Sequence, residues 1–226
     1  MQMPVSALWS DSNMRIKSAL IALLLTSFIQ TAASATVPSA EDVVRATTSQ
    51  TLARLVAQRD ELKKHPERIY DLIHELVIPH FDFPSMSKWV LGPSWRDASD
   101  AQRDAFVGQF RTLLVRTYAK ALLEYSEQEI KFLPTDAQPG SNLAVVKTEV
   151  NQSGGGAPVP IHYRMHISGG EWKVVDVAVD GVSLVSTYRG SFASEIRKSG
   201  IDGLISKLSE RNARLESSLS EAPQSP

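Results

Sequence analysis

The sequence contains no cysteine among its 226 residues. This absence excludes thiol nucleophiles, cysteine-ligated zinc, iron–sulfur clusters and disulfide bonds. Hydrophobic residues make up 42% of the chain, and a chain of this length can bury enough of them to be stable without cross-links. We therefore expect a fold that is stabilised by apolar burial alone.

The sequence also lacks an excess of charge of either sign. Lysine and arginine number 24, aspartate and glutamate number 25, and the formal net charge is -1. Proteins that bind nucleic acids neutralise phosphates with clustered cations. A near-neutral chain provides no such field, so we predict no nucleic-acid partner.

Motifs of the common hydrolases and metal sites are missing as well. The chain has no G-x-S-x-G, no H-E-x-x-H, and no S-x-x-K followed by K-T-G. His162 and His166 fall on one face of a predicted strand, but about 13 Å apart, which is too far for one metal ion. His74 and His80 are separated by a proline and have no partner at a ligand spacing. We predict no metal site, no cofactor and no catalytic residue from these patterns.

No apolar run is long enough to cross a membrane comfortably. The candidate, residues 19–29, follows two basic residues and precedes Ala33-Ser34-Ala35. A basic flank, a short apolar stretch and a small-x-small site describe a secretory signal peptide over residues 1–35, with Met14 as an alternative start. An uncleaved anchor is the other interpretation, but a bilayer span needs about 20 apolar residues. We expect an exported chain.

Helices are predicted in the first half of the remaining chain. Apolar residues recur at helical spacing in three segments: 40–65, 69–77 and 100–125. Ser39 precedes two acids, and Ser99 forms a capping-box pattern with Gln102, so both serines are predicted helix starts. Pro66 is expected to open the second helix, because proline is favoured at a first helical position.

From residue 129 the apolar pattern changes to alternation, which indicates β-strands. Gly169-Gly170 is typical of a tight hairpin between strands 159–167 and 172–179. Counting back from this turn places Tyr163 opposite Asp176. After residue 181 the helical period returns, and Ser183 is predicted to cap the first of two closing helices.

These elements predict one α+β domain over residues 36–219. A helical N-terminal half and C-terminal helices pack with an antiparallel, curved sheet of about four strands. Residues 220–226 are expected to form a disordered tail. A curved sheet half-covered by helices can enclose an apolar cavity. The spacing of apolar residues in the sequence does not distinguish a hollow core from a filled one.

Besides a protein that binds a ligand in such a cavity, two other kinds of protein remain possible at this point. Asp176 in an apolar environment beside Tyr163 could abstract a proton next to a carbonyl, as in a cone-shaped small-molecule enzyme. Alternatively, Asp176 is a structural acceptor, and a solid core would indicate a pure interaction module.

Two ordered blocks of the sequence carry a family resemblance. The first comprises Val90-Leu91-Gly92, Trp95-Arg96, Gln102-Arg103, Phe106 and residues 110–118. The second comprises Trp172-Lys173-Val174, Asp176-Val177, residues 181–185, Tyr188-Arg189, Phe192, Ile196-Arg197-Lys198 and residues 200–205. Over residues 40–212 the chain resembles the MlaC-like family of periplasmic phospholipid-binding proteins, also called toluene-tolerance proteins.

The resemblance implies a sheet like the nuclear-transport-factor cone and a cavity that holds phospholipid acyl chains. It implies a non-enzymatic monomer that shuttles lipid across the periplasm and so maintains outer-membrane lipid asymmetry. Its implied partners are phospholipid as cargo, an outer-membrane lipoprotein–porin complex, and an inner-membrane ABC transporter with a lipid-channel domain.

Period counting on this fold selects the residues expected at the site. The predicted lipid-lining residues are Leu114, Tyr118, Val146, Tyr163, Met165, Val174, Val182, Val185 and Tyr188. Arg189 and Arg197, on the charged face of a closing helix, are predicted to dock the partner complexes.

Overall fold

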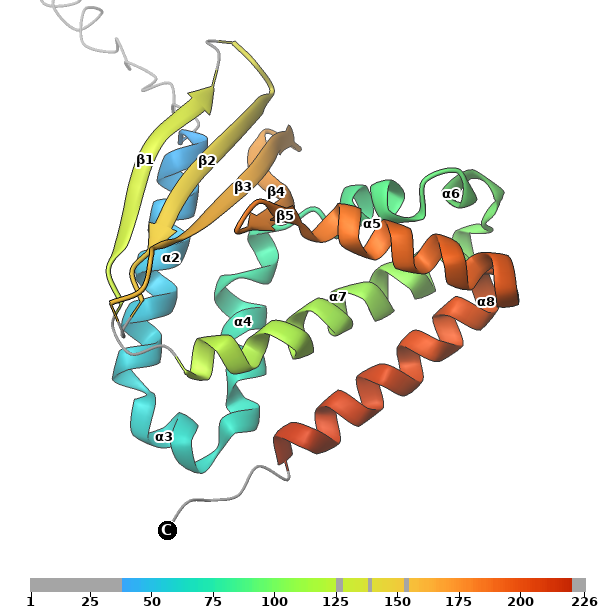
Figure 1. Ribbon diagram of the computed structural model, residues 1–226, viewed down its shortest axis with the longest axis horizontal. Coiled ribbons are helices and arrows are strands. Elements are labelled where there is room, and N and C mark those ends of the chain that lie inside the picture. The colour runs from blue at the N-terminus through green and yellow to red at the C-terminus, as the bar shows by residue number, and fades with distance from the viewer. Residues whose placement is uncertain (1–37, 125–127, 138–139, 153–154, 221–226) are drawn as a thin grey trace, which may run out of the picture. The chain divides into compact units, whose positions relative to one another are not determined.

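The computed structural model describes residues 38–124, 128–137, 140–152 and 155–220 (Figure 1). The predicted signal peptide, residues 1–35, and nearly all of the predicted tail, 220–226, lie outside these ranges. The signal peptide, the domain boundaries and the tail therefore stay predictions.

Helices occupy the N-terminal part of the described chain. They are α2 (Ala40–Ala57), α3 (Arg59–Lys64), the 3-10 turn η1 (Pro66–Arg68), α4 (Ile69–Leu76), the 3-10 turn η2 (Ile78–His80), α5 (Phe83–Leu91), α6 (Ser94–Asp97) and α7 (Asp100–Leu123). The segment predicted as one helix over 40–65 is interrupted at Gln58, whose backbone leaves the helical region.

Both predicted helix starts are confirmed by their hydrogen bonds. The Ser39 hydroxyl accepts from the backbone N–H of Asp42 at 3.1 Å, and the Asp42 carboxylate accepts from the Ser39 N–H at 3.1 Å. Ser99 and Gln102 form the same reciprocal pair at the start of α7. Such caps satisfy N–H groups that have no partner within the helix, and each typically contributes about 1 kcal/mol.

The sheet is an antiparallel meander in the order β1-β2-β3-β4-β5. Its strands are β1 (Ile130–Ala137), β2 (Leu143–Val150), β3 (Val159–Ser168), β4 (Glu171–Val179) and β5 (Val182–Ser183). The α+β prediction is confirmed, with a fifth strand beyond the four expected. This short strand follows a turn in which Asp180 (φ 51) and Gly181 (φ 77) both have positive φ, the backbone of a tight hairpin.

The predicted register across the β3–β4 hairpin holds for only part of its length. Ile167 faces Trp172 and Met165 faces Val174, as counted from the turn. Beyond Met165 the register shifts, so that Tyr163 faces Val177 and Arg164 faces Asp176. The pairing of Tyr163 with Asp176 is therefore wrong. A β-bulge adds one residue to β4, and a shift of one residue moves a side chain to the other face of the sheet.

The chain closes with the long helix α8 (Leu184–Ser220), which Gly200 divides in two. The backbone of Gly200 (φ 71, ψ -179) is not helical. Because L-residues rarely adopt this conformation, glycine ends the first closing helix here as predicted. The second half of α8 returns along α7 (Figure 1).

Candidate functional site

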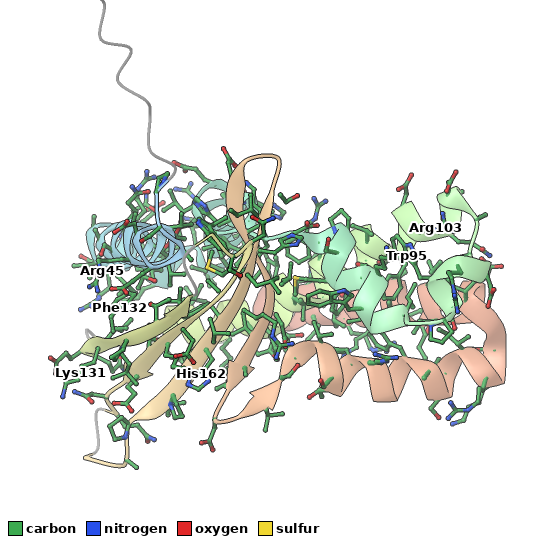
Figure 2. The ribbon with its side chains drawn as sticks, turned by 90° about the horizontal axis from the view of Figure 1, so that it is seen from above. Arg45, Trp95, Arg103, Lys131, Phe132 and His162 are labelled. Carbon is green, nitrogen blue, oxygen red and sulfur yellow. The ribbon has the colours of Figure 1, made fainter. Side chains whose placement is uncertain are left out.

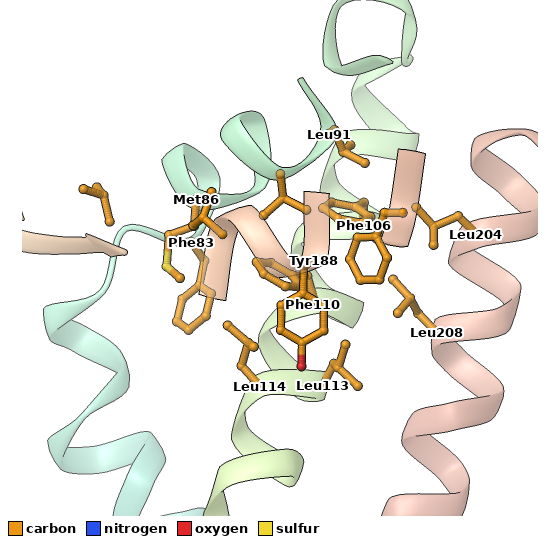
Figure 3. Close-up of a cluster of buried hydrophobic side chains, with 14 residues drawn as sticks. Phe83, Met86, Leu91, Phe106, Phe110, Leu113, Leu114, Tyr188, Leu204 and Leu208 are labelled. Atoms are coloured by element: carbon orange, nitrogen blue, oxygen red, sulfur yellow. The ribbon is translucent and has the colours of Figure 1, made fainter. Parts of the chain in front are cut away.

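Buried apolar residues form two clusters around the predicted site. The sheet cluster lies between α2 and the central strands and comprises Ala40, Val44, Ala144, Val146, Met165 and Val174. The helical cluster lies between α5, α7 and α8 (Figure 3) and comprises Phe83, Met86, Val90, Leu91, Phe106, Phe110, Leu113, Leu114, Val175, Val185, Tyr188, Phe192, Leu204 and Leu208.

Aromatic rings organise the helical cluster. Phe110 meets Tyr188 edge-on, with ring centroids 5.4 Å apart and an interplanar angle of 77°. Phe192 lies edge-on to both Phe106 (5.8 Å) and Phe110 (6.0 Å). Edge-to-face pairs at these separations are favourable beyond the area that they bury. Together these contacts join the first half of α8 to the middle of α7.

The predicted lipid-lining residues are divided between these two clusters. Val146, Met165 and Val174 belong to the sheet cluster, and Tyr163 packs against it. Leu114, Val185 and Tyr188 belong to the helical cluster. The structure therefore does not bring the predicted set together as one surface.

Phe81 lies where the two clusters meet. Its side chain packs against both, its ring stacks on Phe83 at 5.7 Å, and its backbone bridges Val174 of β4. Period counting did not find Phe81 because it lies in an irregular segment between η2 and α5. A large apolar residue beside Asp82-Phe83-Pro84 was the only signal in the sequence.

Two predicted lining residues lie at the surface. Val182 in β5 is 60% exposed and Tyr118 on α7 is 40% exposed. The Tyr118 hydroxyl is hydrogen-bonded to that of Tyr188, and desolvation together with this neighbour raises the pKa of Tyr118 to about 12. The Tyr118 phenol thus stays neutral at physiological pH, and its contact with Tyr188 links α7 to α8 at the rim of the helical cluster.

Tyr163 lies on the face of the sheet that carries the sheet cluster. Burial raises the pKa of its phenol, and a hydrogen bond with Thr148 opposes that shift. Thr148 also donates to the carbonyl of Ile161 at 3.2 Å. The phenol therefore has the Thr148 hydroxyl as its hydrogen-bonding neighbour, and Val177, not Asp176, lies opposite it in β4.

Asp176 is a structural acceptor at the start of α8. It is 3% exposed, and its carboxylate accepts from the Ser183 hydroxyl at 2.7 Å and from the Val185 N–H at 3.1 Å. Ser183 in turn accepts from the Ser186 N–H at 3.0 Å, as predicted for a helix cap. The Arg164 guanidinium lies 3.9 Å away. The proton-abstraction hypothesis for Asp176 with Tyr163 is thereby corrected.

Replacing Asp176 with asparagine is expected to lower the free energy of unfolding by about 1–3 kcal/mol, because an amide N–H₂ replaces one acceptor of a buried donor. Asp180→Asn is the matched control. Asp180 is exposed, and asparagine tolerates its positive φ, so we expect a change within about 0.5 kcal/mol. Urea denaturation of both variants measures the difference. Equal stabilities would contradict the capping role of Asp176.

The predicted docking residues both lie exposed on the first half of α8. The Arg189 guanidinium reaches back over the backbone of Gly92, at the end of α5. Arg197 lies two turns further along the helix. Figure 1 shows this half of α8 beside α5.

The predicted absence of a metal site concerns four histidines. His166 is hydrogen-bonded to the Asp82 carboxylate at 2.8 Å, and this carboxylate also accepts from the Ser85 N–H at 2.9 Å to cap α5. Across residues 38–220, wherever the structure describes them, no three His, Cys, Asp or Glu side chains are grouped to hold a metal ion.

In the same residues no helix is both long enough and apolar enough to cross a bilayer.

Comparison with protein families gives one match over most of the chain. Residues 45–210 match the family model described as MlaC protein. The match runs from within α2 to the second half of α8, and it includes the helical cluster and all of the sheet cluster except Ala40 and Val44.

Known proteins from several bacteria are similar to this chain. The toluene tolerance protein ttg2D of Pseudomonas putida is 32% identical over 182 residues, which cover 80% of this chain and 82% of that protein. The intermembrane phospholipid transport system binding protein MlaC of Haemophilus influenzae is 25% identical over 193 residues, covering 84% of this chain and 90% of that protein.

The third comparison is structural. A phospholipid-binding protein from Ralstonia solanacearum, solved in complex with a phospholipid, has 31% sequence identity and a TM-score of 0.74. The alignment covers 79% of this chain and 99% of that one.

Proposed function

The chain belongs to the MlaC protein family, and we propose that it is a non-enzymatic carrier that binds phospholipid and moves it between membranes. The observation that carries this proposal is the likeness, over 79% of this chain and 99% of the other, to a structure that holds a phospholipid. The relative from Haemophilus influenzae is likewise named for binding within a phospholipid transport system. We place the exported protein in the periplasm, where it would help to maintain outer-membrane lipid asymmetry.

The physical task explains why such a protein needs no covalent chemistry. Burying one methylene is worth about 0.8 kcal/mol, so two acyl chains with about 30 methylenes face more than 20 kcal/mol on entering water. An apolar interior that travels with the lipid removes this barrier. For the lipid to be released, its free energy in the carrier must be close to its free energy in the acceptor. Strong contacts between the carrier and the lipid head group would therefore be a disadvantage.

We propose that the acyl chains lie along the boundary between the sheet cluster and the helical cluster. The predicted lining residues occupy both sides of this boundary, and Phe81 packs against both clusters. Val146 and Met165 are fully buried in the closed packing. Lipid must therefore separate the clusters, and the apolar surfaces so exposed would be covered by acyl chains.

Lipid binding is tested by native mass spectrometry of the protein purified from cells, followed by organic extraction. We expect a diacyl phospholipid to co-purify, because acyl chains bound in a dry interior exchange slowly with water. Delipidated protein should take up lipid again from vesicles. A protein that is empty as purified and also fails to take up lipid would overturn the carrier function.

We further propose that Arg189 and Arg197 steer docking to acidic surfaces of the two membrane complexes. Steering by exposed charges acts on the association rate and is screened as the Debye length falls from about 10 Å at 0.1 M salt to about 3 Å at 1 M. The double variant Arg189→Glu and Arg197→Glu should slow association with the inner-membrane complex by about tenfold without releasing lipid.

Surface plasmon resonance at several salt concentrations measures this effect. Lys63→Glu, an exposed charge reversal on α3, is the matched control and should leave the rate unchanged. A rate that does not depend on salt, or loss of lipid from the double variant, would show that these arginines do not serve docking.

A further inference from the structure

A shallow hollow lies on the surface where α5, α6 and α8 meet. It encloses about 350 Å³ and is lined by Lys88, Trp89, Gly92, Pro93, Trp95, Arg96 and Arg189. None of these residues belongs to the predicted lipid-lining set. The hollow is therefore a separate feature from the predicted lipid-binding surface.

The turn between α5 and α6 builds one wall of the hollow. Gly92 ends α5 with φ 56 and ψ -125, a conformation that favours glycine. A Cβ atom at this position would lie 3.1 Å from Nη2 of Arg189. Glycine thus lets the Arg189 guanidinium lie close against the backbone.

Contacts from α7 fix the opposite wall. Arg103 donates from Nε to the carbonyl of Trp95 at 2.9 Å and lies over the indole, 5.5 Å from the ring centroid. Trp95 also packs against the helical cluster. Figure 2 shows Trp95 and Arg103 together among the helices, away from Lys131 and His162 on the sheet. Such a preformed wall costs little conformational entropy when a ligand binds.

The lining combines two indoles with three cations and contains no carboxylate. Lys88, Arg96 and Arg189 are exposed, and Trp89 is 36% exposed. Asp100, at the start of α7, is instead paired with Arg103 at 2.9 Å. The charge of the hollow is therefore complementary to an anion, and tryptophan with arginine is the composition that dominates binding energy at protein interfaces.

We propose that this hollow binds a carboxylate-bearing segment of a partner protein. The planar Arg189 guanidinium can donate two parallel hydrogen bonds to an Asp or Glu carboxylate, and an apolar neighbour of that residue can pack on Trp89. This inference deepens the docking part of the proposed function and rests on it, but adds a defined pocket, a ligand chemistry and an aromatic anchor.

The shape of the site favours a protein segment over a lipid bilayer. Binding to a bilayer surface requires apolar side chains that project from the protein and insert among the lipids. Here the indoles line a concavity, and Trp95 is held inward by the helical cluster. A side chain from a partner can enter such a hollow, whereas a flat membrane surface cannot.

The test is a titration of the lipid-loaded chain, monitored by the indole N–H resonances of Trp89 and Trp95. The probe is the peptide acetyl-Gly-Glu-Leu-Glu-Gly-amide, compared with the same peptide carrying Gln for Glu. Arg189→Glu and Trp89→Ala should each raise the dissociation constant of the Glu peptide about tenfold. Lys131→Glu, the same charge change on exposed β1, should change it by less than about twofold.

Each outcome bears on the proposal. Loss of affinity in the Arg189 and Trp89 variants with retention in the Lys131 variant supports it. Equal binding of the Glu and Gln peptides, or equal effects of Arg189→Glu and Lys131→Glu, overturns it. The proposal is also overturned if the wild-type protein binds vesicles of phosphatidylethanolamine with phosphatidylglycerol and Trp89→Ala abolishes this binding. The hollow would then be a membrane contact.

The lipid content of each variant separates this proposal from the carrier function. If the wild-type protein contains no phospholipid and takes none up, the carrier function is refuted, whether or not the peptide binds. If charge reversal at Arg197 slows docking while changes at Arg189 and Trp89 do not, docking stands and the hollow is excluded from it.

Discussion

Replacing Phe110 with alanine is expected to lower the free energy of unfolding by about 3–5 kcal/mol. Phe110 is fully buried, and its ring contacts the rings of Phe106, Tyr188 and Phe192 at centroid distances of 5.4–6.0 Å. Removing the ring leaves a cavity at the contact between α7 and α8. Because domains are typically stable by about 5–15 kcal/mol, this single change removes a large part of the total.

Chemical denaturation followed by circular dichroism measures the loss. Val56→Ala is the control for an apolar truncation outside the core, since Val56 is 43% exposed, and its effect should stay within about 0.5 kcal/mol. A loss at Phe110 no larger than at Val56 would mean that α8 is not held to α7 by these rings. The same cluster carries three of the predicted lining residues, so its integrity also bears on lipid binding.

Replacing Val146 with tryptophan is expected to lower the amount of co-purified phospholipid by about tenfold or more. Val146 is fully buried in the sheet cluster, on the face of the sheet covered by α2. In a carrier, the added indole would occupy space that opens for acyl chains. Overpacking a filled core typically costs about 1–3 kcal/mol of stability, so the variant should remain folded while its lipid content falls.

Val145→Trp is the matched control for this change. Val145 is the next residue along β2 and pairs with Arg164, so its side chain lies on the opposite face of the sheet. Its lipid content should match that of the wild type, as quantified by mass spectrometry after extraction. If Val146→Trp loses stability but keeps its lipid, Val146 belongs to a filled core and not to the binding surface. Val174→Trp provides a second test at the opposite edge of the same cluster.

The division of the predicted lining between two clusters has a consequence for mechanism. Each cluster is closed by its own packing, and Phe81 is the side chain that packs against both. On the proposed location of the acyl chains, lipid entry requires the sheet to separate from the helices that cover it. Residues that join the two parts, such as the hydrogen-bonded pair Asp82 and His166, would influence how readily this happens.

The sequence by itself determined the elements of the fold. Helix starts at Ser39, Ser99 and Ser183 depend on a hydroxyl and on residues within one turn of it. The hairpin at Gly169-Gly170 depends on two adjacent glycines, both with positive φ. These features are local, so a reading of the chain over a few residues is sufficient to predict them. The ordered motifs over residues 40–212 likewise indicated the family.

Only the tertiary structure decided which of these residues meet. The bulge in β4 moved Asp176 away from Tyr163 and onto the cap of α8, because a bulge depends on how two strands pair and not on the alternation within one. Phe81 lies in an irregular segment where no period predicts a direction. The contact of Arg189 with Gly92 joins residues that are 97 positions apart in the chain. Packing between distant segments, which a periodic pattern does not encode, set the geometry of both candidate sites.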